Sequence, residues 1–108
     1  MSRQVKIFQP TGILDGARAN QLRREISEVI TSGPDVVLLD LKEVTFMDSS
    51  GLGALVSALK SVRSSGGKLF VCSINDQVKM LFELTSMDRV FEIYPNQDAF
   101  HQAVLAAD

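Results

Sequence analysis

The segment Asp48-Ser49-Ser50-Gly51 contains the residues whose types and spacing could carry chemistry in this 108-residue sequence. Two adjacent hydroxyls follow a carboxylate at the point where a strand-like pattern gives way to a helical one. A serine hydroxyl can accept a phosphoryl group, which adds roughly −1.5 to −2 charges and three acceptor oxygens. Because a helix N-terminus favours anions, a phosphate on Ser50 in the first turn should leave the fold nearly unchanged while altering the surface that a partner meets.

The same segment also fits a purely structural role, which is that of a capped helix. Asp48 or Ser49 can accept a hydrogen bond from an unpaired backbone N–H of the first turn. From the residues alone, the cap is the preferred interpretation, because such caps are common.

Two glycines accompany the hydroxyls, although a glycine inside a helix costs roughly 1 kcal/mol relative to alanine. We interpret Gly51 as keeping the surface around Ser50 flat, so that the catalytic cleft of another protein can reach the hydroxyl. Gly53 fits either that role or close packing of the helix against a sheet or loop.

An enzymatic role for these hydroxyls lacks support in the sequence. A serine hydrolase needs a base near its nucleophile and exposes that nucleophile on a Gly-x-Ser-x-Gly turn. The only histidine is His101, which we expect to be an ordinary surface or half-buried residue of the last helix. No Cys/His cluster is present for a metal, and no Gly-x-x-x-x-Gly-Lys segment for a phosphate. We therefore expect a protein substrate that is not an enzyme and that needs no cofactor and no metal.

A second candidate phosphoryl acceptor is Asp40, at the end of the apolar run 36–39. This run resembles the acceptor strand of a receiver domain, in which an aspartate is phosphorylated. That chemistry needs a magnesium ion held by an acidic pair after the first strand, and residues 8–11 contain no carboxylate. We expect Asp40 instead to cap or bond local backbone, and the receiver is the less favoured alternative.

Alternating strand and helix patterns must position the segment. Apolar residues at helical spacing predict helices from Asp15 to a Ser32-Gly33-Pro34 stop and from Ser49 to Gly66-Gly67. Continuous apolar runs predict strands buried on both faces at 35–41 and 69–73. Shorter strands are expected at 5–9, 13–14 and 90–94, and further helices around 78–82 and from Pro95-Asn96 onward. This order predicts an α/β fold in which helices cover a sheet of parallel neighbours.

Composition excludes several other classes of protein. The net charge is −2 and no basic cluster is present, which disfavours a nucleic-acid partner. No apolar run approaches the length of a membrane span, and the N-terminus lacks a signal-peptide core. The single cysteine, Cys72, cannot form an internal disulfide, as is usual in a reducing compartment. Together these features lead us to expect a cytoplasmic protein with no membrane partner. The length fits one domain over residues 1–108.

The segment 46–53 and the order of the elements resemble the STAS family, the anti-sigma factor antagonists. The resemblance covers essentially the whole chain. The family's early Gly-x-Leu-Asp turn resembles residues 12–15, and its central strands resemble residues 37–41 and 66–72. Its third helix resembles residues 78–82. It implies a single STAS-like domain with a mixed, mostly parallel β-sheet flanked by about four helices.

In that family, the serine matching Ser50 is phosphorylated by an anti-sigma factor that is also a serine/threonine kinase. The resemblance therefore favours phosphorylation over the cap. It implies that the unphosphorylated chain binds the kinase, that phosphorylation releases it, and that a serine phosphatase resets the cycle. The implied partner surface consists of Asp15, Asp48, Ser49, Ser50, Gly51 and Leu52. The main alternative to this role in transcription regulation is a STAS binding module of a signal-transduction pathway that does not end in a sigma factor.

Overall fold

The computed structural model describes residues 4–31, 33 and 36–106 of the chain. The strands are β1 (Val5–Phe8), β2 (Gly12–Leu14), β3 (Val36–Asp40), β4 (Val44–Met47), β5 (Lys68–Cys72) and β6 (Glu92–Tyr94). The helices are α1 (Gly16–Ile30), α2 (Ser49–Ser64), α3 (Asp76–Leu84) and α4 (Gln97–Phe100), with a 3₁₀ turn η1 (Met87–Arg89) and a π turn η2 (His101–Leu105). None of the helices in the described ranges is long and apolar enough to cross a membrane.

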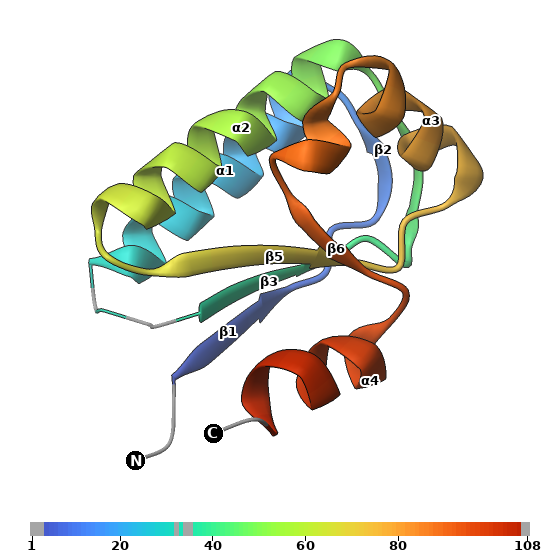
Figure 1. Ribbon diagram of the computed structural model, residues 1–108. Helices are drawn as coiled ribbons and strands as arrows, with labels where there is room; N and C mark the ends of the chain where they lie inside the picture. Colours follow the sequence, from blue (N-terminus) through green and yellow to red (C-terminus); the bar gives the residue numbers. More distant parts are fainter. Residues whose placement is uncertain (1–3, 32, 34–35, 107–108) are drawn as a thin grey trace.

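All strand pairings among the described residues are parallel. The central sheet has the order β1-β3-β5-β6, and a second, two-stranded sheet pairs β2 with β4. Helices α1 and α2 run side by side over one face of the central sheet, and α4 covers the opposite face (Figure 1). The predicted α/β fold, with a mostly parallel sheet and about four helices, is confirmed.

Two hydrophobic cores hold these layers together. Strand β3 is buried over its whole length, as its continuous apolar run predicted. Because successive side chains of a strand point to opposite faces, Val37 and Leu39 join the core under α1 and α2, whereas Val36 and Leu38 join the smaller core that contains Phe100. Burial of each such side chain stabilises the fold by roughly 1.5–3 kcal/mol. Packing on both faces therefore holds β3 in place between the helical layers.

Strand β4 is the element that the sequence patterns did not predict. Only Val44 and Met47 of this strand are buried, and the two residues between them are exposed, so the pattern matches neither a buried nor an alternating strand. Strand β6 is also shorter than expected, because Val90 and Phe91 form a turn after η1 in which both backbone N–H groups donate to the carbonyl of Met87. The expected helix stop at Ser32 and Pro34, and the strand start at Asp35, lie outside the described residues.

Candidate functional site

Two equivalent strand–carboxylate–helix units lie next to each other at one edge of the molecule. Strand β2 ends at Leu14 and strand β4 at Met47, and these two residues are register partners. Each strand is followed by an aspartate in extended conformation, Asp15 or Asp48, and then by the first turn of α1 or α2. Because the strands are parallel and the two helices pack together, both helix starts meet at the same place.

The two aspartates cap these helices. Asp15 Oδ1 accepts a hydrogen bond from the backbone N–H of Arg18 at 3.0 Å. Asp48 Oδ1 accepts one from the backbone N–H of Gly51 at 2.7 Å. The capping role predicted for Asp48 is therefore confirmed, and the caps fix the orientation of both first turns.

Ser50 is exposed in the first turn of α2, as predicted, and Ser49 is exposed beside it. Within the described part of the chain, neither hydroxyl makes a hydrogen bond, so neither is committed to a structural role. A solvent-facing, unengaged hydroxyl beside two capping carboxylates is chemically available as an acceptor of a group brought by another protein.

The first residue of α1 borders Ser50 directly. A Cβ atom built on Gly16 would lie 3.1 Å from Ser50 Cβ and 3.9 Å from Ser50 Oγ. A side chain at position 16 would therefore crowd the side chain of Ser50, which would have to shift to accommodate it. Sequence periodicity gives no signal for this contact, because the two residues belong to different helices.

The interpretation of Gly51 as a residue that keeps the surface flat is wrong. Gly51 is buried, and a Cβ atom there would overlap the carbonyl oxygen of Leu14 and lie 3.3 Å from Met47 Cγ. Glycine is needed at this position because α2 approaches the backbone of β2. For Gly53 the packing explanation fails instead, because a Cβ atom there would meet nothing within 4 Å.

The expected partner surface is narrower than the sequence suggested. Leu52 is only 4% exposed and packs in the main core, so with the buried Gly51 it offers little to a partner. Asp15 and Asp48 are half-buried and both serines are exposed. Of the proposed six residues, these four remain at the surface.

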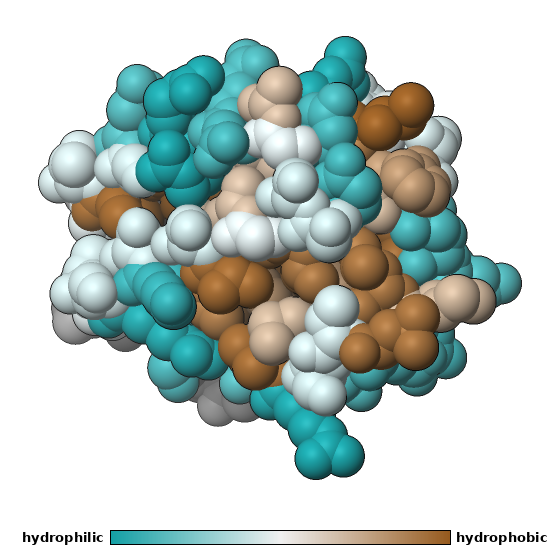
Figure 2. Space-filling view, turned by 90° about the horizontal axis from the view of Figure 1, so that it is seen from above, coloured by the Kyte–Doolittle hydropathy of each residue, from teal (hydrophilic) through white to brown (hydrophobic). Residues whose placement is uncertain are grey.

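An exposed apolar pair beside the site was missed from the sequence. Ile13 and Phe46 are register partners on β2 and β4, and they are 55% and 45% exposed. Each of them precedes a capping aspartate by two residues. The only feature of the sequence that could have indicated their exposure is that both are large apolar residues outside the strong periodic patterns. Figure 2 views the molecule from above Figure 1 and shows that apolar side chains reach the surface of this face in patches among polar ones.

Asp40, the alternative phosphoryl acceptor, is buried and its carboxylate is fully engaged. It is 2% exposed and accepts hydrogen bonds from Gln9 Nε2 at 2.8 Å, from Gln97 Nε2 at 2.7 Å and from the backbone N–H of Lys42 at 3.1 Å. Burial raises the pKa of Asp40, but these hydrogen bonds outweigh it and hold the pKa below its usual value. The predicted bond to local backbone is confirmed. No group of three His, Cys, Asp or Glu side chains in the described residues could hold a metal ion.

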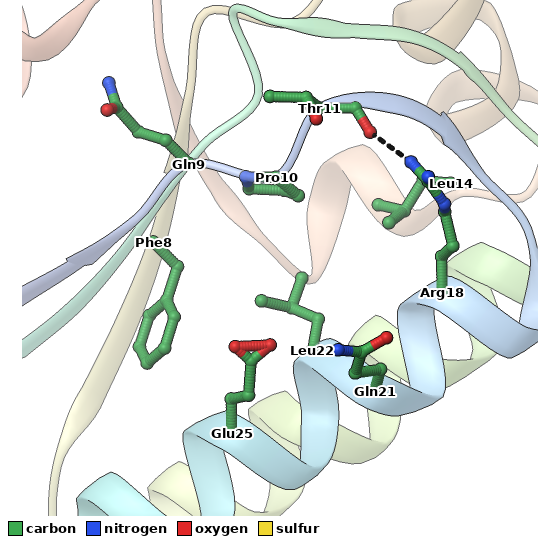
Figure 3. Close-up of a pocket in the computed structure, with 9 residues that line it drawn as sticks. All are labelled: Phe8, Gln9, Pro10, Thr11, Leu14, Arg18, Gln21, Leu22 and Glu25. Carbon is green, nitrogen blue, oxygen red and sulfur yellow. Dashed lines mark hydrogen bonds between the residues drawn. The ribbon is translucent and has the colours of Figure 1, made fainter.

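A polar pocket of about 360 Å³ lies between α1 and the chain that links β1 to β2 (Figure 3). The guanidinium of Arg18 donates to the carbonyl of Thr11 at 2.8 Å across its rim, and Glu25 lines the other end. The pocket does not include Ser50, and it places one cation and one carboxylate in the same small space.

Comparisons with known proteins agree with this architecture. Residues 2–99 match the family model described as the STAS domain. The chain is 32% identical over 96 residues to the anti-sigma F factor antagonist of Paenibacillus polymyxa, which covers 88% of this chain and 82% of that protein. It is also similar to the crystal structure of an anti-sigma factor antagonist from Mycobacterium paratuberculosis, with a TM-score of 0.81 and 27% identity over 94% of this chain and 86% of that one.

The fold is shared with a protein that has been solved in two phosphorylation states. The anti-sigma factor antagonist SpoIIAA from Bacillus gives a TM-score of 0.77 in its unphosphorylated form and 0.70 in its phosphorylated form. The identities are 20% and 19% over 95% of this chain, and over 90% and 94% of the two SpoIIAA chains, so this likeness concerns the fold alone.

Proposed function

Because this chain belongs to the STAS domain family, among the anti-sigma factor antagonists, we propose that it is a regulatory binding protein switched by phosphorylation of Ser50. In the unphosphorylated state it binds an anti-sigma factor that has serine kinase activity, and phosphorylation releases that partner. A serine phosphatase returns the chain to its binding state. The observation that carries the proposal is the exposed, unengaged hydroxyl of Ser50 in the first turn of α2.

The proposed modification is a phosphoryl transfer in which this chain is the substrate. The Oγ of Ser50 forms a bond to the γ-phosphorus of ATP held by the kinase, while the bond from that phosphorus to the oxygen bridging the β-phosphate breaks. ADP leaves, and the hydroxyl proton passes to a base of the kinase. The chain supplies only the hydroxyl and its presentation, so we propose no catalytic activity for it.

The charges around Ser50 explain how a phosphate could act as a switch. Asp15 and Asp48 already place two carboxylates beside the first turns. A phosphate adds roughly −1.5 to −2 charges at this edge, and a like-charge or desolvation penalty in an interface amounts to several kcal/mol. The first-turn N–H groups and the dipole of α2 favour the same charge within the domain. Binding should therefore weaken while the fold persists.

The test combines site mapping with two substitutions. Phosphosite mapping by mass spectrometry, on protein isolated from its native cells, should find a phosphate on Ser50. Ser50→Ala should fold normally, escape phosphorylation and retain its kinase partner in a pull-down, whereas Ser50→Asp should lose it with little change in melting temperature. The matched control Ser49→Ala should still be phosphorylated. Phosphate on the Ser50→Ala variant at the wild-type level, or no phosphate on Ser50 under any growth condition, would refute the assignment.

The setting that we propose for this switch is a single domain over residues 1–108 in the cytoplasm. The proposal is supported by the STAS match over residues 2–99 and by the single cysteine, Cys72, which cannot form an internal disulfide. A protein of the cytoplasm meets both ATP-dependent kinases and anti-sigma factors, which fits the proposed partners.

A further inference from the structure

Gly16 has no reason to be a glycine on account of its backbone. It is the first residue of α1, and its φ angle does not lie in the positive region that favours glycine, unlike those of Gly12, Gly33 and Gly66. A glycine in a helix is destabilising by roughly 0.5–1 kcal/mol relative to alanine. Some feature outside the backbone of α1 must therefore explain why a side chain is absent here.

That feature is the side chain of Ser50. Apart from its chain neighbours and the backbone of α1, the only described atoms within 4 Å of a Cβ built on Gly16 belong to Ser50. They are Ser50 Cβ at 3.1 Å and Ser50 Oγ at 3.9 Å. The first distance is shorter than ordinary van der Waals contact, so even alanine would press on Ser50. A longer side chain would start from this crowded position, 3.9 Å from the hydroxyl oxygen.

We propose that Gly16 is a positioning residue for phosphoryl transfer, because it leaves one side of Ser50 Oγ open to the incoming phosphorus and makes room for the phosphate that results. The inference rests on the proposed function of Ser50. Reacting atoms must come within about 3–3.5 Å of each other before the bond forms. A methyl group 3.9 Å from Oγ would stand beside that path, and larger groups would block it.

The same geometry favours one of two neighbouring hydroxyls. Gly16 borders Ser50, and no atom of Ser49 lies among its contacts within 4 Å. Both serines are exposed, so exposure alone cannot make one the acceptor. An opening in α1 at Ser50 gives a physical basis for selection between them.

The test measures access to position 50 without any kinase. Ser50→Cys places a thiol at the site, and the only native cysteine, Cys72, is fully buried and serves as a silent background. Reaction of the new thiol with dithiobis-nitrobenzoate releases a coloured thiolate, so its rate reports approach to the atom that replaces Oγ. We expect Gly16→Leu to slow this reaction about tenfold, equivalent to roughly 1.4 kcal/mol of activation free energy.

Three controls separate blocked access from a disturbed fold. Gly53→Leu adds the same side chain in open space on α2 and should leave the Ser50→Cys rate within about twofold. A thiol introduced by Ser49→Cys should also react within about twofold of its own rate when Gly16→Leu is added. Circular dichroism verifies folding, and if Gly16→Leu does not fold, Gly16→Ala provides the comparison with an expected slowing of about threefold.

Equal rates for the Ser50→Cys thiol with and without the Gly16 substitution would overturn the proposal, as would equal slowing at positions 49 and 50. The thiol result does not depend on phosphorylation in cells. If labelling is selective but Ser50 carries no phosphate in native cells, the proposed function fails while the opening beside Ser50 stands.

Discussion

Replacing Gly51 with alanine places a methyl group between α2 and the backbone of β2. The new Cβ would overlap the carbonyl oxygen of Leu14 and lie 3.1 Å from its carbonyl carbon and 3.3 Å from Met47 Cγ. Backbone atoms cannot rotate away as a side-chain end can, and Met47 is fully buried. The helix must therefore move away from the strand, which opens the packing of both helix starts.

The expected loss of stability follows from two opposing contributions. Overpacking of a well-packed core costs about 1–3 kcal/mol, whereas exchange of glycine for alanine in a helix gains about 0.5–1 kcal/mol. We expect Gly51→Ala to lower the free energy of unfolding by about 1–2 kcal/mol. At roughly 4–8 °C per kcal/mol for a domain of this size, the melting temperature should fall by about 5–15 °C.

The neighbouring Gly53 offers a matched control, because a methyl group there meets nothing within 4 Å. Gly53→Ala should raise the free energy of unfolding by about 0.5–1 kcal/mol. Urea unfolding followed by circular dichroism measures both variants under the same conditions. If Gly51→Ala is as stable as the parent chain, or if both alanines shift stability in the same direction, the close approach of α2 to Leu14 is not what requires Gly51.

Two further predictions concern other parts of the fold. The pKa of Asp40 is lowered in the folded state from its ordinary value of 3.8, so its stabilising contribution is complete above that value and is lost as the pH falls below it. Asp40→Ala removes the acceptor for Gln9 and Gln97. Urea unfolding at a series of pH values should show that this variant loses about 1–3 kcal/mol of unfolding free energy at neutral pH, and that the loss shrinks below the unfolded pKa. An equal loss of unfolding free energy at all pH values would contradict this. Ser86 has a φ of 60°, so Ser86→Gly should stabilise the domain by about 0.5 kcal/mol, whereas the control Ser57→Gly inside α2 should destabilise it by a similar amount in thermal melts.

The fold could be predicted largely from the sequence because its signals are local. Helical spacing and continuous apolar runs depend on neighbouring residues, and β3 is buried throughout as its run predicted. Strand β4 was missed because its four residues, Val-Thr-Phe-Met, form neither a long apolar run nor an alternation that matches its buried positions, Val44 and Met47. Its pairing with β2 depends on a register that no local pattern expresses.

The site could be predicted only in part, because its decisive contacts join distant segments. Successive helix residues are turned by about 100°, so Gly51 and Gly53 point in nearly opposite directions, and the sequence does not show which one faces β2. The two glutamine partners of Asp40 lie 31 and 57 residues away. The contact of Gly16 with Ser50 likewise links two helices. Ser50 stays a prediction, which rests on the family resemblance of its segment, while the cap by Asp48 and the start of α2 are local features that the residues themselves indicate.

Different parts of the chain cover the two faces of the central sheet. Opening of the C-terminal helix on one face is therefore separate from any movement of α1 and α2 on the other. In the described residues, the smaller core around Phe70 and Cys72 is covered by Phe100 and the residues that follow it, on the side away from α1 and α2 (Figure 1). Local opening of that last helix would uncover Cys72 and leave the paired helix starts at Ser50 in place. Fraying at the C-terminal end therefore need not disturb the proposed phosphorylation site at Ser50, and the reactivity of the Cys72 thiol would measure that fraying.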